Sequence, residues 1–522
     1  MTSLTCNCKW APLVLLTFSC CLALSSLLIL FVIPSIIQNQ ISESLPLLNS
    51  TDSRTFDKWE VIPLPIVTNF YIFNITNPEE VENDGQTPIV QELGPYVYVE
   101  YRKKINISYS ENESIVKYAQ RRTWYYKPEL SRGSLSDPVY HLNVPLVAAG
   151  DYVKRSGGSL FIYYAVNEMA KFTHSKLITK HTVGQLLFEG YEDKLIDAAR
   201  KMKMPVPYDK FGWFYGRNHT VSDGIFEVYT GKSDLNRIDE MYSWNGNHTL
   251  KLWWGDQCNS LKDVSASDFQ RPFQETPLEK LNIFVGDICR SLDLPFNRSV
   301  YKHSVKAHRY AATEAIFNYD VPENICWCEN ASRPLCPPSG VGTIAPCQHG
   351  SPSAASLPHF LHGDPVLRER VRGLEPNPHK HEFYMDIEPT LGIATKVKVA
   401  MQINVLLERN PKLEFSKKIP FDSIYFPMIW FSAGAEVDES MAKQLKLLQN
   451  LPIILNSLAA LFASVGIVML LIILIVFRVK LWPKEKMQLV RYSFDSSSYS
   501  RNLFELQRNT SIPSVPTQEP EN

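Results

Sequence analysis

The chain has 522 residues, with 53 Lys and Arg against 54 Asp and Glu, so its formal net charge at pH 7 is −1. A balanced charge without a long basic run or a Gly-rich phosphate loop argues against nucleic acid as a partner. A hydrophobic content of 45%, with 11% aromatic residues, is ample for a large folded core and excludes a disordered stalk.

Two long apolar runs lie near the two ends of the chain. Residues 11–33 and 452–477 carry no charged side chain and are long enough to cross a bilayer as helices. The first run is longer than the apolar part of an ordinary signal peptide, which favours an uncleaved anchor over a cleaved leader. Lys and Arg residues follow the second run and mark the cytosolic side. Both tails, residues 1–10 and 478–522, are therefore expected in the cytosol.

The segment between the runs, residues 34–451, is expected to be extracellular or luminal. It reads as one large domain, because it has no internal repeat and no long low-complexity linker. It holds eight Asn-x-Ser/Thr triplets, which together agree with a glycosylated surface, although any single triplet can arise by chance. The eight acceptors are Asn49, Asn74, Asn106, Asn112, Asn218, Asn247, Asn297 and Asn330. A ninth triplet, at Asn509, lies in the expected cytosolic tail and should stay unmodified.

Six of the ten cysteines lie between the runs, within residues 258–347. Four of them are crowded into residues 326–347 without the paired C-x2-C and H-x3-H spacings of tetrahedral zinc sites, so a zinc knuckle is the weaker interpretation. In an oxidising compartment, six cysteines predict three disulfides, for which fifteen pairings exist. The six are Cys258, Cys289, Cys326, Cys328, Cys336 and Cys347.

Strand-like alternation occurs at both ends and in the middle of the domain. Five aromatic-rich or alternating stretches have a period of two residues and are bounded by turn residues. They span residues 69–75, 96–109, 224–231, 395–407 and 423–431. The pattern predicts a mixed, mainly antiparallel sheet or barrel.

Helical periodicity is concentrated between about residues 159 and 204, within a helical cap expected over about residues 145–204. In residues 159–171, one helix side is apolar and the other mixes aromatic and charged side chains. The first side comprises Ile162, Ala165, Val166 and Met169, and the second Phe161, Tyr164, Glu168 and Lys171. Residues 183–202 predict a second amphipathic helix, and residues 438–449 a third that leads into the second apolar run. Two interpretations of the first two helices stay open: a hairpin packed on the sheet, or a cap that exposes Phe161 to a partner or a lipid surface.

Two histidine groups invite an enzymatic interpretation, which their spacing does not support. The first is His359 and His362, and the second begins with His379 and His381 and continues through Glu382, Asp386 and Glu388. Neither matches H-E-x-x-H or another spaced ligand set, so structural or surface roles are favoured over a metal site. No nucleophile elbow or other catalytic constellation is present. We therefore expect no enzyme activity, no metal and no cofactor.

Short stretches over nearly the whole chain carry a family resemblance. They include FNITNPEEV at residues 73–81, ELGPYVY at 92–98, FGWFYGRNHT at 211–220, LWWGDQCN at 252–259 and GLEPNPHKHEFYMDIEPTLG at 373–392. In this order, between two terminal apolar runs, they resemble the class B scavenger receptors, the family of the fatty acid translocase, the high-density lipoprotein receptor and a lysosomal integral membrane protein. The resemblance implies an α+β ectodomain with an antiparallel β-barrel core, a membrane-distal helical cap and a hydrophobic tunnel toward the bilayer.

The resemblance also implies which residues bind ligands. An exposed aromatic residue and nearby lysines of the family's cap receive lipoprotein, fatty acid or protein ligands. Phe161 matches the aromatic position, with Tyr164 on the same side of the helix, and the lysine region maps approximately to Lys171, Lys176 and Lys180. A cationic face would attract anionic phospholipid or lipoprotein surfaces, whereas an ordinary solvated face would not.

Further roles follow from the same resemblance. The implied disulfides join Cys258 to Cys326, Cys289 to Cys347, and Cys328 to Cys336. Cys6 and Cys8, at the membrane edge, match palmitoylated cysteines. His181 resembles cap histidines that sense acid in the lysosomal member, although an isolated histidine is more often a bystander.

Two functions are therefore expected from the sequence. The first is a receptor that docks lipid particles on the cap and passes fatty acids, sterols, cholesteryl esters or carotenoids through the tunnel. The second is a receptor for a protein cargo, or a lysosomal sorting receptor, without net lipid transport. The tail lacks an acidic dileucine ending, which favours the plasma membrane over a lysosomal or endosomal membrane. Small residues of the second run, Ala459, Ala460, Ala463 and Gly466, would permit helix contacts in a homo-oligomer.

Overall fold

A computed structural model describes residues 11–49, 54–203, 206, 208–274, 276–332 and 335–481. The chain divides into two compact units. One unit contains residues 1–38 and 450–522, and the other contains residues 39–449. Cys6, Cys8 and the tail beyond residue 481 lie outside the described residues, so the expected palmitoylation sites have no structural description here.

The two apolar runs form the long helices of the first unit. The N-terminal helix comprises α1 (Ala11–Leu27), the π-helical turn η1 (Leu28–Val32) and α2 (Ile33–Ser44). The C-terminal helix is α11 (Glu439–Leu481), which begins in the second unit. Because about 20 apolar residues suffice to cross a bilayer, both helices are long enough to span one. A two-pass membrane protein follows.

The two spans pack against each other through small side chains. Ser19 Oγ donates to the Gly466 carbonyl oxygen at 2.8 Å, and Ser26 Oγ donates to that of Ala459 at 3.0 Å. Ser26 lies seven residues after Ser19, and its partner Ala459 lies seven residues before Gly466. This equal and opposite spacing is that of an antiparallel coiled coil. At Gly466 an added Cβ would lie 3.5 Å from the Ser19 carbonyl oxygen, so the absence of a side chain permits this close approach.

Burial extends the same pattern along both helices. The least exposed positions recur at alternating steps of four and three residues, while the other faces are exposed. They are Leu15, Ser19, Leu22, Ser26, Ile29 and Ile33 on the first span, and Leu455, Ala459, Phe462, Gly466, Met469 and Ile473 on the second. Ala459 and Gly466, expected as possible oligomer contacts, face the chain's own first span instead.

This packing predicts a specific cross-link in the full-length protein. In a background with Cys20 and Cys21 replaced by serine, cysteines introduced at Leu22 and Ala463, both on the packed faces, should form a disulfide under mild oxidation in membranes. Adding Gly466→Leu should abolish most of that cross-link, because the larger side chain forces the helices apart.

The matched control introduces the first cysteine at Leu24, which faces outward. Equal cross-linking from position 22 and position 24, or an undiminished yield in the Gly466→Leu protein, would contradict this packing. Gel mobility without reducing agent, on protein labelled at both termini, measures the yield.

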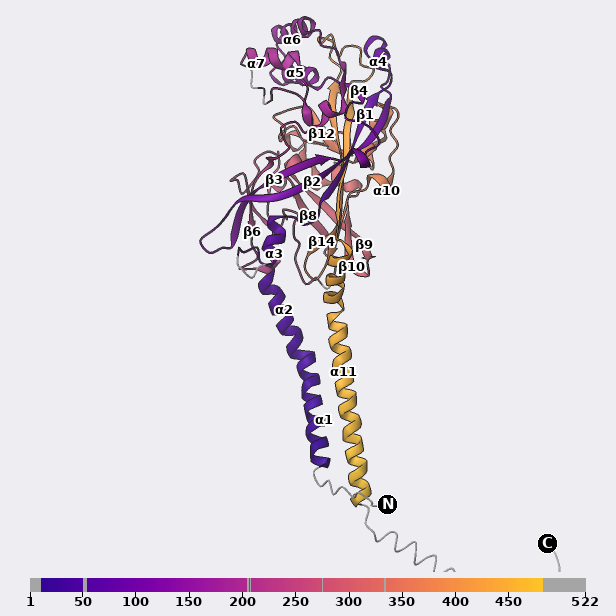
Figure 1. Ribbon diagram of the computed structural model, residues 1–522. Coiled ribbons are helices and arrows are strands. Elements are labelled where there is room, and N and C mark those ends of the chain that lie inside the picture. Colours follow the sequence, from indigo (N-terminus) through magenta and orange to yellow (C-terminus); the bar gives the residue numbers. More distant parts are fainter. Residues whose placement is uncertain are drawn as a thin grey trace, which may run out of the picture. The chain divides into compact units, whose positions relative to one another are not determined.

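The second unit is built on one large antiparallel sheet (Figure 1). Eleven strands follow each other in the order β7-β6-β3-β2-β1-β15-β14-β13-β10-β9-β8, and β12 pairs with both β14 and β11. The strands are β1 (Ile66–Ile75), β2 (Val90–Tyr109), β3 (Ile115–Tyr126), β6 (Thr220–Tyr229), β7 (Met241–Trp244), β8 (Lys280–Val285), β9 (Arg290–Lys302), β10 (Val305–Ala311), β11 (Val341–Thr343), β12 (Ser353–Ser356), β13 (Tyr384–Glu388), β14 (Ile393–Glu408) and β15 (Ser423–Glu436). The five segments predicted as strands all lie in this sheet.

A short segment around Ser265, which we call the strap, closes the sheet into a barrel. Ser265 bridges Glu240, beside the first strand of the order, and also Ile283 on the last strand. The buried Asp239 carboxylate fixes the strap, because its Oδ2 accepts from Ser265 Oγ at 3.1 Å and from the backbone N–H of Phe269 at 3.1 Å. The two edges of the sheet therefore meet, and the strands enclose an interior.

Three helices gather at one end of the sheet and form a cap (Figure 1). They are α5 (Val144–Arg155), α6 (Leu160–Thr173) and α7 (Lys194–Lys201), joined by the hairpin of β4 (Pro138–Leu142) and β5 (Ile178–Thr182). The cap is held to the end of β14, where Lys154 Nζ donates to Glu408 at 2.7 Å, and to the loop that follows, where Asn167 Nδ2 donates to the Lys412 carbonyl oxygen at 2.7 Å.

The second predicted cap helix is wrong as a continuous element. Residues 183–202 form a π-helical turn, η3 (Gln185–Glu189), then an extended segment, and only then α7. Gly190 has φ 72° and ψ 154°, a conformation open to glycine alone, and an added Cβ would lie 2.7 Å from the Tyr215 ring. Asp193 then starts α7 by accepting from the N–H groups of Leu195 and Ile196.

The remaining short elements connect the strands. They are α3 (Arg54–Glu60), α4 (Pro78–Asp84), α8 (Asp256–Asn259), α9 (Pro365–Glu369), α10 (Pro378–His381), and the 3-10 turns η2 (Pro128–Leu130), η4 (Leu235–Arg237), η5 (Gly286–Ile288), η6 (Glu314–Phe317), η7 (Pro322–Trp327), η8 (Glu329–Ala331) and η10 (Pro358–Phe360). The expected fold is confirmed: two terminal apolar helices and a large antiparallel ectodomain sheet with helices.

Three disulfides link the loops beside β8 and β9. They join Cys258 to Cys326, Cys289 to Cys347, and Cys328 to Cys336. The first two bridge 68 and 58 residues of sequence, loops long enough for about 4 kcal/mol each of unfolded-state entropy. The Cys289 bridge comes directly after η5, so it fixes a turn that contributes to the interior described next.

Candidate functional site: an apolar cavity with a polar band

The barrel encloses a large cavity of about 1090 Å³. Its walls come from the inner faces of the strands and from the underside of the cap, and they are mainly apolar. Representative wall residues are Phe226 on β6, Ile283 on β8, Met385 on β13, Met401 on β14 and Phe431 on β15. The volume falls at the upper end of the range of small-molecule sites, which favours a bulky or long apolar ligand.

One end of the cavity lies under the cap. Ile162, Ala165, Val166 and Met169, the apolar side predicted for residues 159–171, all line it and are half-buried. The sequence predicts that these residues form an apolar core stripe. In the structure they face a cavity as well as packed side chains. Leu195 and Ile196 of α7 line the same end.

The other end of the cavity lies beside the segments that lead to the spans. Leu45 directly follows α2, and Met441 lies in the first turn of α11, and both line the cavity. Leu64 and Ile393 complete an apolar wall there. The cavity is therefore bordered at one end by the cap and at the other by residues adjacent in sequence to both long helices.

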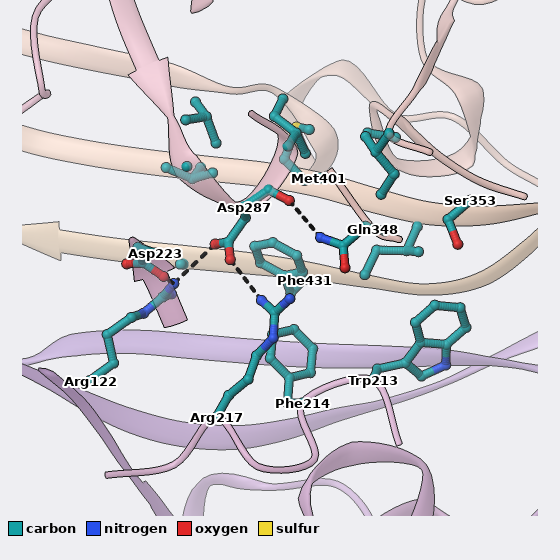
Figure 2. A pocket seen from close by; sticks show the side chains of 18 of the residues that line it. Arg122, Trp213, Phe214, Arg217, Asp223, Asp287, Gln348, Ser353, Met401 and Phe431 are labelled. Carbon is teal, nitrogen blue, oxygen red and sulfur yellow. Dashed lines mark hydrogen bonds and ion pairs between the residues drawn. The ribbon is translucent and has the colours of Figure 1, made fainter. Parts of the chain in front are cut away.

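A band of buried ion pairs interrupts the apolar wall (Figure 2). Arg122 of β3 lies at its centre: its Nε donates to Glu100 at 2.7 Å, and its Nη1 lies 3.1 Å from Asp223 and 3.0 Å from Asp287. Arg217 Nη1 donates to the other Asp287 oxygen at 2.7 Å. We call these five residues, with Arg102 on Glu100, the polar band.

Burial and charge act in opposite directions within the polar band. Burial alone would raise the pKa of Glu100, but the guanidinium groups of Arg102 and Arg122 lower it to about 2. Burial also opposes ionisation of Asp287, yet Arg122 and Arg217 hold its pKa below the usual range. Burial would lower the pKa of Arg122, whereas Asp223 and the other carboxylates raise it well above its ordinary value. Glu100, Asp287 and Arg122 therefore stay ionised at neutral pH, in a band of three basic and three acidic side chains.

The expected ligand residues of the cap lie outside the cavity, except Phe161. Phe161 is 77% exposed and Tyr164 is 64% exposed, both on the outer side of α6. Phe161 also borders the cavity, so it lies at the cavity's rim. Phe172, the most exposed of these at 86%, lies on the same helix and was not expected from the sequence. Its spacing of eleven residues from Phe161 places it three turns along the same face.

The three expected lysines are exposed but do not form one cluster of unpaired charges. Lys171 Nζ pairs with Glu168 at 2.7 Å, one turn earlier on α6. Lys176 lies after α6, and Lys180 lies on β5, where its Nζ is 5.2 Å from the centre of the Tyr140 ring. The exposed aromatic residues therefore share one helix, whereas the three lysines lie on α6, after it and on β5.

The eight glycosylation acceptors divide by exposure. Six are exposed, and two are half-buried and already used in hydrogen bonds: Asn74 Oδ1 accepts from the Tyr140 N–H at 2.8 Å, and the Asn218 side chain bonds both the N–H and the C=O of Trp124. The six are Asn49, Asn106, Asn112, Asn247, Asn297 and Asn330. Glycosylation at these positions stays a prediction.

The two histidine groups contribute one residue each to a buried cluster. Glu92, His359 and His381 bring one potential ligand atom each within 4.8 Å of one another. However, the Nδ1 atoms of both histidines accept backbone N–H bonds at 3.0 Å, from Glu375 and Asn377. Each Nε2 therefore carries the hydrogen, which is the wrong tautomer for coordination through Nε2. The donor set does not fit a metal ion, and His362 and His379 lie exposed elsewhere.

The same cluster has an evident structural role instead. The Glu92 carboxylate accepts from His359 Nε2 at 2.7 Å, from Lys380 Nζ at 2.6 Å and from Trp430 Nε1 at 2.7 Å. These bonds lower the pKa of Glu92 to about 2 although burial acts against ionisation. The cluster ties β2, η10, α10 and β15 together. Asp386 of the second group likewise pairs with Arg309 through both oxygens.

His181 is paired rather than isolated. Its Nδ1 lies 2.9 Å from Nε2 of the buried His141, whose own Nδ1 lies 2.8 Å from the Leu142 carbonyl oxygen, and its ring stacks on Tyr191 at 3.6 Å. Since a carbonyl only accepts, His141 carries its hydrogen on Nδ1 and accepts from His181 through Nε2. Burial, followed by the neighbouring His181, lowers the pKa of His141 to about 3, and burial lowers that of His181.

The chain is similar to known proteins over most of its length. The model of the CD36 family matches residues 16–477. The chain belongs to the CD36 family. It is 31% identical over 433 residues to scavenger receptor class B member 1 of Mus musculus, covering 81% of this chain and 80% of the relative. It is 29% identical over 444 residues to lysosome membrane protein 2 of Homo sapiens, covering 85% and 89%. The resemblance to class B scavenger receptors is confirmed.

The histidine pair predicts that the cap is less stable in acid. Below pH 6.5 the unfolded chain binds protons that folded His141 cannot, so stability should fall as the pH drops, by about 2 kcal/mol at pH 5. Hydrogen exchange at β4 and β5, compared at pH 7.4 and pH 5 after correction for intrinsic rates, should show the loss.

His141→Asn keeps a donor to the Leu142 carbonyl oxygen but cannot titrate, so its β4 and β5 should lose most of this acid sensitivity. His248→Asn, at an exposed histidine, is the matched control and should behave like the native protein. Acid sensitivity that survives unchanged in the His141→Asn protein would show that another group is responsible.

Proposed function

We propose that this CD36-family protein is a class B scavenger-type receptor that docks lipoproteins or other lipid surfaces on its cap and passes lipid through its ectodomain. The observation that carries the proposal is a cavity that is bordered by the cap at one end and by Leu45 and Met441 at the other. In this proposal the cavity is the tunnel, and its two ends are the entry and the exit.

The physical advantage of such a path is that it keeps an apolar chain away from water. Each methylene group left in solvent costs about 0.8 kcal/mol relative to an apolar environment, so a free lipid chain crosses water rarely. Wall residues such as Phe226, Met401 and Phe431 offer the chain an apolar surface along the way. Fatty acids, sterols, cholesteryl esters and carotenoids all fit that description.

The outer side of α6 is the proposed docking surface. Leu160, Phe161, Tyr164 and Phe172 are all highly exposed, an arrangement that costs solubility in an isolated protein and is typical of contact with lipid or protein. Lys176, three residues after the end of α6, and Lys180 on β5 are exposed and would add attraction to anionic phospholipid heads. Residues 34–451 would then lie outside the cell with glycans at the exposed acceptors, and both tails would lie in the cytosol of a plasma-membrane protein, with Cys6 and Cys8 as palmitoylation sites.

A second candidate function is a receptor for a protein cargo in lysosomal or endosomal membranes. The observation that favours it is the acid-sensitive contact between His141 and His181 inside the cap, because such a contact would couple cargo release to luminal pH. Similarity to lysosome membrane protein 2 agrees with this alternative. In this case the cap would bind protein and the cavity would be incidental.

Two variants of the full-length protein separate docking from transport. Phe161→Ser with Phe172→Ser should lower particle docking and lipid uptake together, by at least about tenfold, since loss of one aromatic contact commonly exceeds 1.4 kcal/mol. Ala435→Trp, which adds a large ring to the cavity wall, should leave docking intact and reduce lipid uptake. Particles with separately labelled protein and lipid, given to cells expressing each variant, measure both quantities.

Each variant has a matched control. Tyr301→Ser removes an aromatic side chain that is 71% exposed outside the cap, and Val221→Trp adds a large ring on β6 away from the cavity. Unchanged lipid uptake in the Ala435→Trp protein, with native surface abundance, would favour the protein-cargo receptor. Unchanged docking after both cap substitutions would remove α6 from the docking surface.

A further inference from the structure

We propose that Arg217 is a head-group site within the cavity, where it binds the carboxylate of a lipid whose chain lies along the apolar wall. This inference rests on the proposed function, since it needs lipid in the cavity, and it adds a residue that would select among lipids. It follows from the unused donors of Arg217, from the rigidity of its segment and from the rings beside it.

Arg217 is an incompletely used cation at the edge of the polar band, as is Arg102, whose side chain bonds Glu100 alone among the described residues. A guanidinium group has five N–H donors. Within the described part of the chain, the Arg217 side chain makes one hydrogen bond, from Nη1 to Asp287, which leaves Nε and Nη2 unpaired. Arg122, by contrast, contacts Glu100, Asp223 and Asp287 and is nearly buried. Arg217 is 22% exposed and lines the cavity, so its remaining donors are accessible to a ligand.

The segment that carries Arg217 is fixed at both of its ends. Trp213 and Phe214 donate their backbone N–H groups to the carbonyl oxygens of Leu186 and Leu187 at 2.9 and 2.8 Å. Asn218 is bonded to both backbone groups of Trp124 on β3. A guanidinium group held on such a segment loses little conformational freedom when a ligand binds, so little of the binding free energy is lost to ordering.

Apolar rings lie directly beside the guanidinium group. Its carbon is 5.9 Å from the centre of the Phe214 ring, and that ring is 6.1 Å from the ring of Phe431 (Figure 2). Met401 lies on the same wall. A carboxylate at Arg217 would therefore place the first methylene groups of its chain against aromatic and aliphatic surface.

The unpaired N–H groups of Arg217 favour a carboxylate over a neutral head group of equal size. The three basic and three acidic side chains of the polar band already neutralise one another, and Asp287 is shared between two guanidinium groups. A ligand carboxylate at the free edge of Arg217 receives charge-assisted hydrogen bonds, which are about twice as strong as neutral ones. An alcohol at the same place receives only the weaker kind, so the site should discriminate between an acid and an alcohol with the same chain.

The test measures photolabelling of the full-length protein, in phospholipid nanodiscs, by a diazirine analogue of hexadecanoic acid. Unlabelled hexadecanoic acid or 1-hexadecanol is added as the competitor. In the native protein the acid should compete more strongly than the alcohol. Arg217→Gln should weaken competition by the acid at least about tenfold, the effect of losing one charge-assisted contact of about 1.4 kcal/mol, and should leave the alcohol unchanged. Arg217→Lys, which keeps the charge but not the planar fork, should lie between the two.

The matched control is Arg237→Gln. Arg237 also pairs with a carboxylate, Glu240, and lies over an aromatic ring, Tyr229, but it does not line the cavity. In the Arg237→Gln protein, the acid and the alcohol should each compete as they do in the native protein. Unchanged competition by the acid in the Arg217→Gln protein, or an equal loss for acid and alcohol in both Arg217 variants, would overturn the head-group site. Absence of competable labelling in the native protein would instead overturn the proposed function, so the two failures are distinguishable.

Discussion

The buried contacts of Arg122 are the interaction on which the interior of this ectodomain depends. One guanidinium group joins β2 through Glu100, β6 through Asp223 and the turn η5 through Asp287. Removing one partner of a buried ion pair typically costs about 3–5 kcal/mol, because the other charge is left without compensation. Collapse of the sheet into the cavity would separate these buried charges, so the ion pairs favour strands that stay apart around the apolar space.

The closed sheet, the disulfides and the cap all act on that same space. The strap at Ser265 joins the two edges of the sheet, and the Cys289 bridge fixes the turn that carries Asp287. The cap covers one end with the inner side of α6, while the outer side of that helix presents Phe161 and Phe172 to solvent. A single helix thus borders the cavity and carries the proposed docking surface.

Much of the architecture could be predicted from local sequence patterns, whereas the polar centre could not. Apolar runs and strand alternation depend on neighbouring residues, so the spans, β1, β2, β14 and β15 were visible in the sequence. The helix expected over residues 183–202 was wrong because Gly190 and Asp193 interrupt an otherwise helical pattern.

The polar band has no local signature, because Arg122, Asp223 and Asp287 are each separated by dozens of residues and meet only in the closed barrel. For the same reason, His141 could not be assigned as the partner of His181 from the sequence. Family resemblance supplied Phe161, but Phe172 was accessible only from the exposure of the folded cap.

The central claim is that the cavity carries lipid, and the most direct measurement is the lipid content of the ectodomain itself. Residues 39–449, secreted from cultured cells and purified without detergent, would be extracted with organic solvent and analysed by mass spectrometry beside an unrelated secreted glycoprotein. The account predicts about one enriched lipid molecule per ectodomain, and Ala435→Trp should lower that content. A correctly folded ectodomain with no more lipid than the control protein would contradict it.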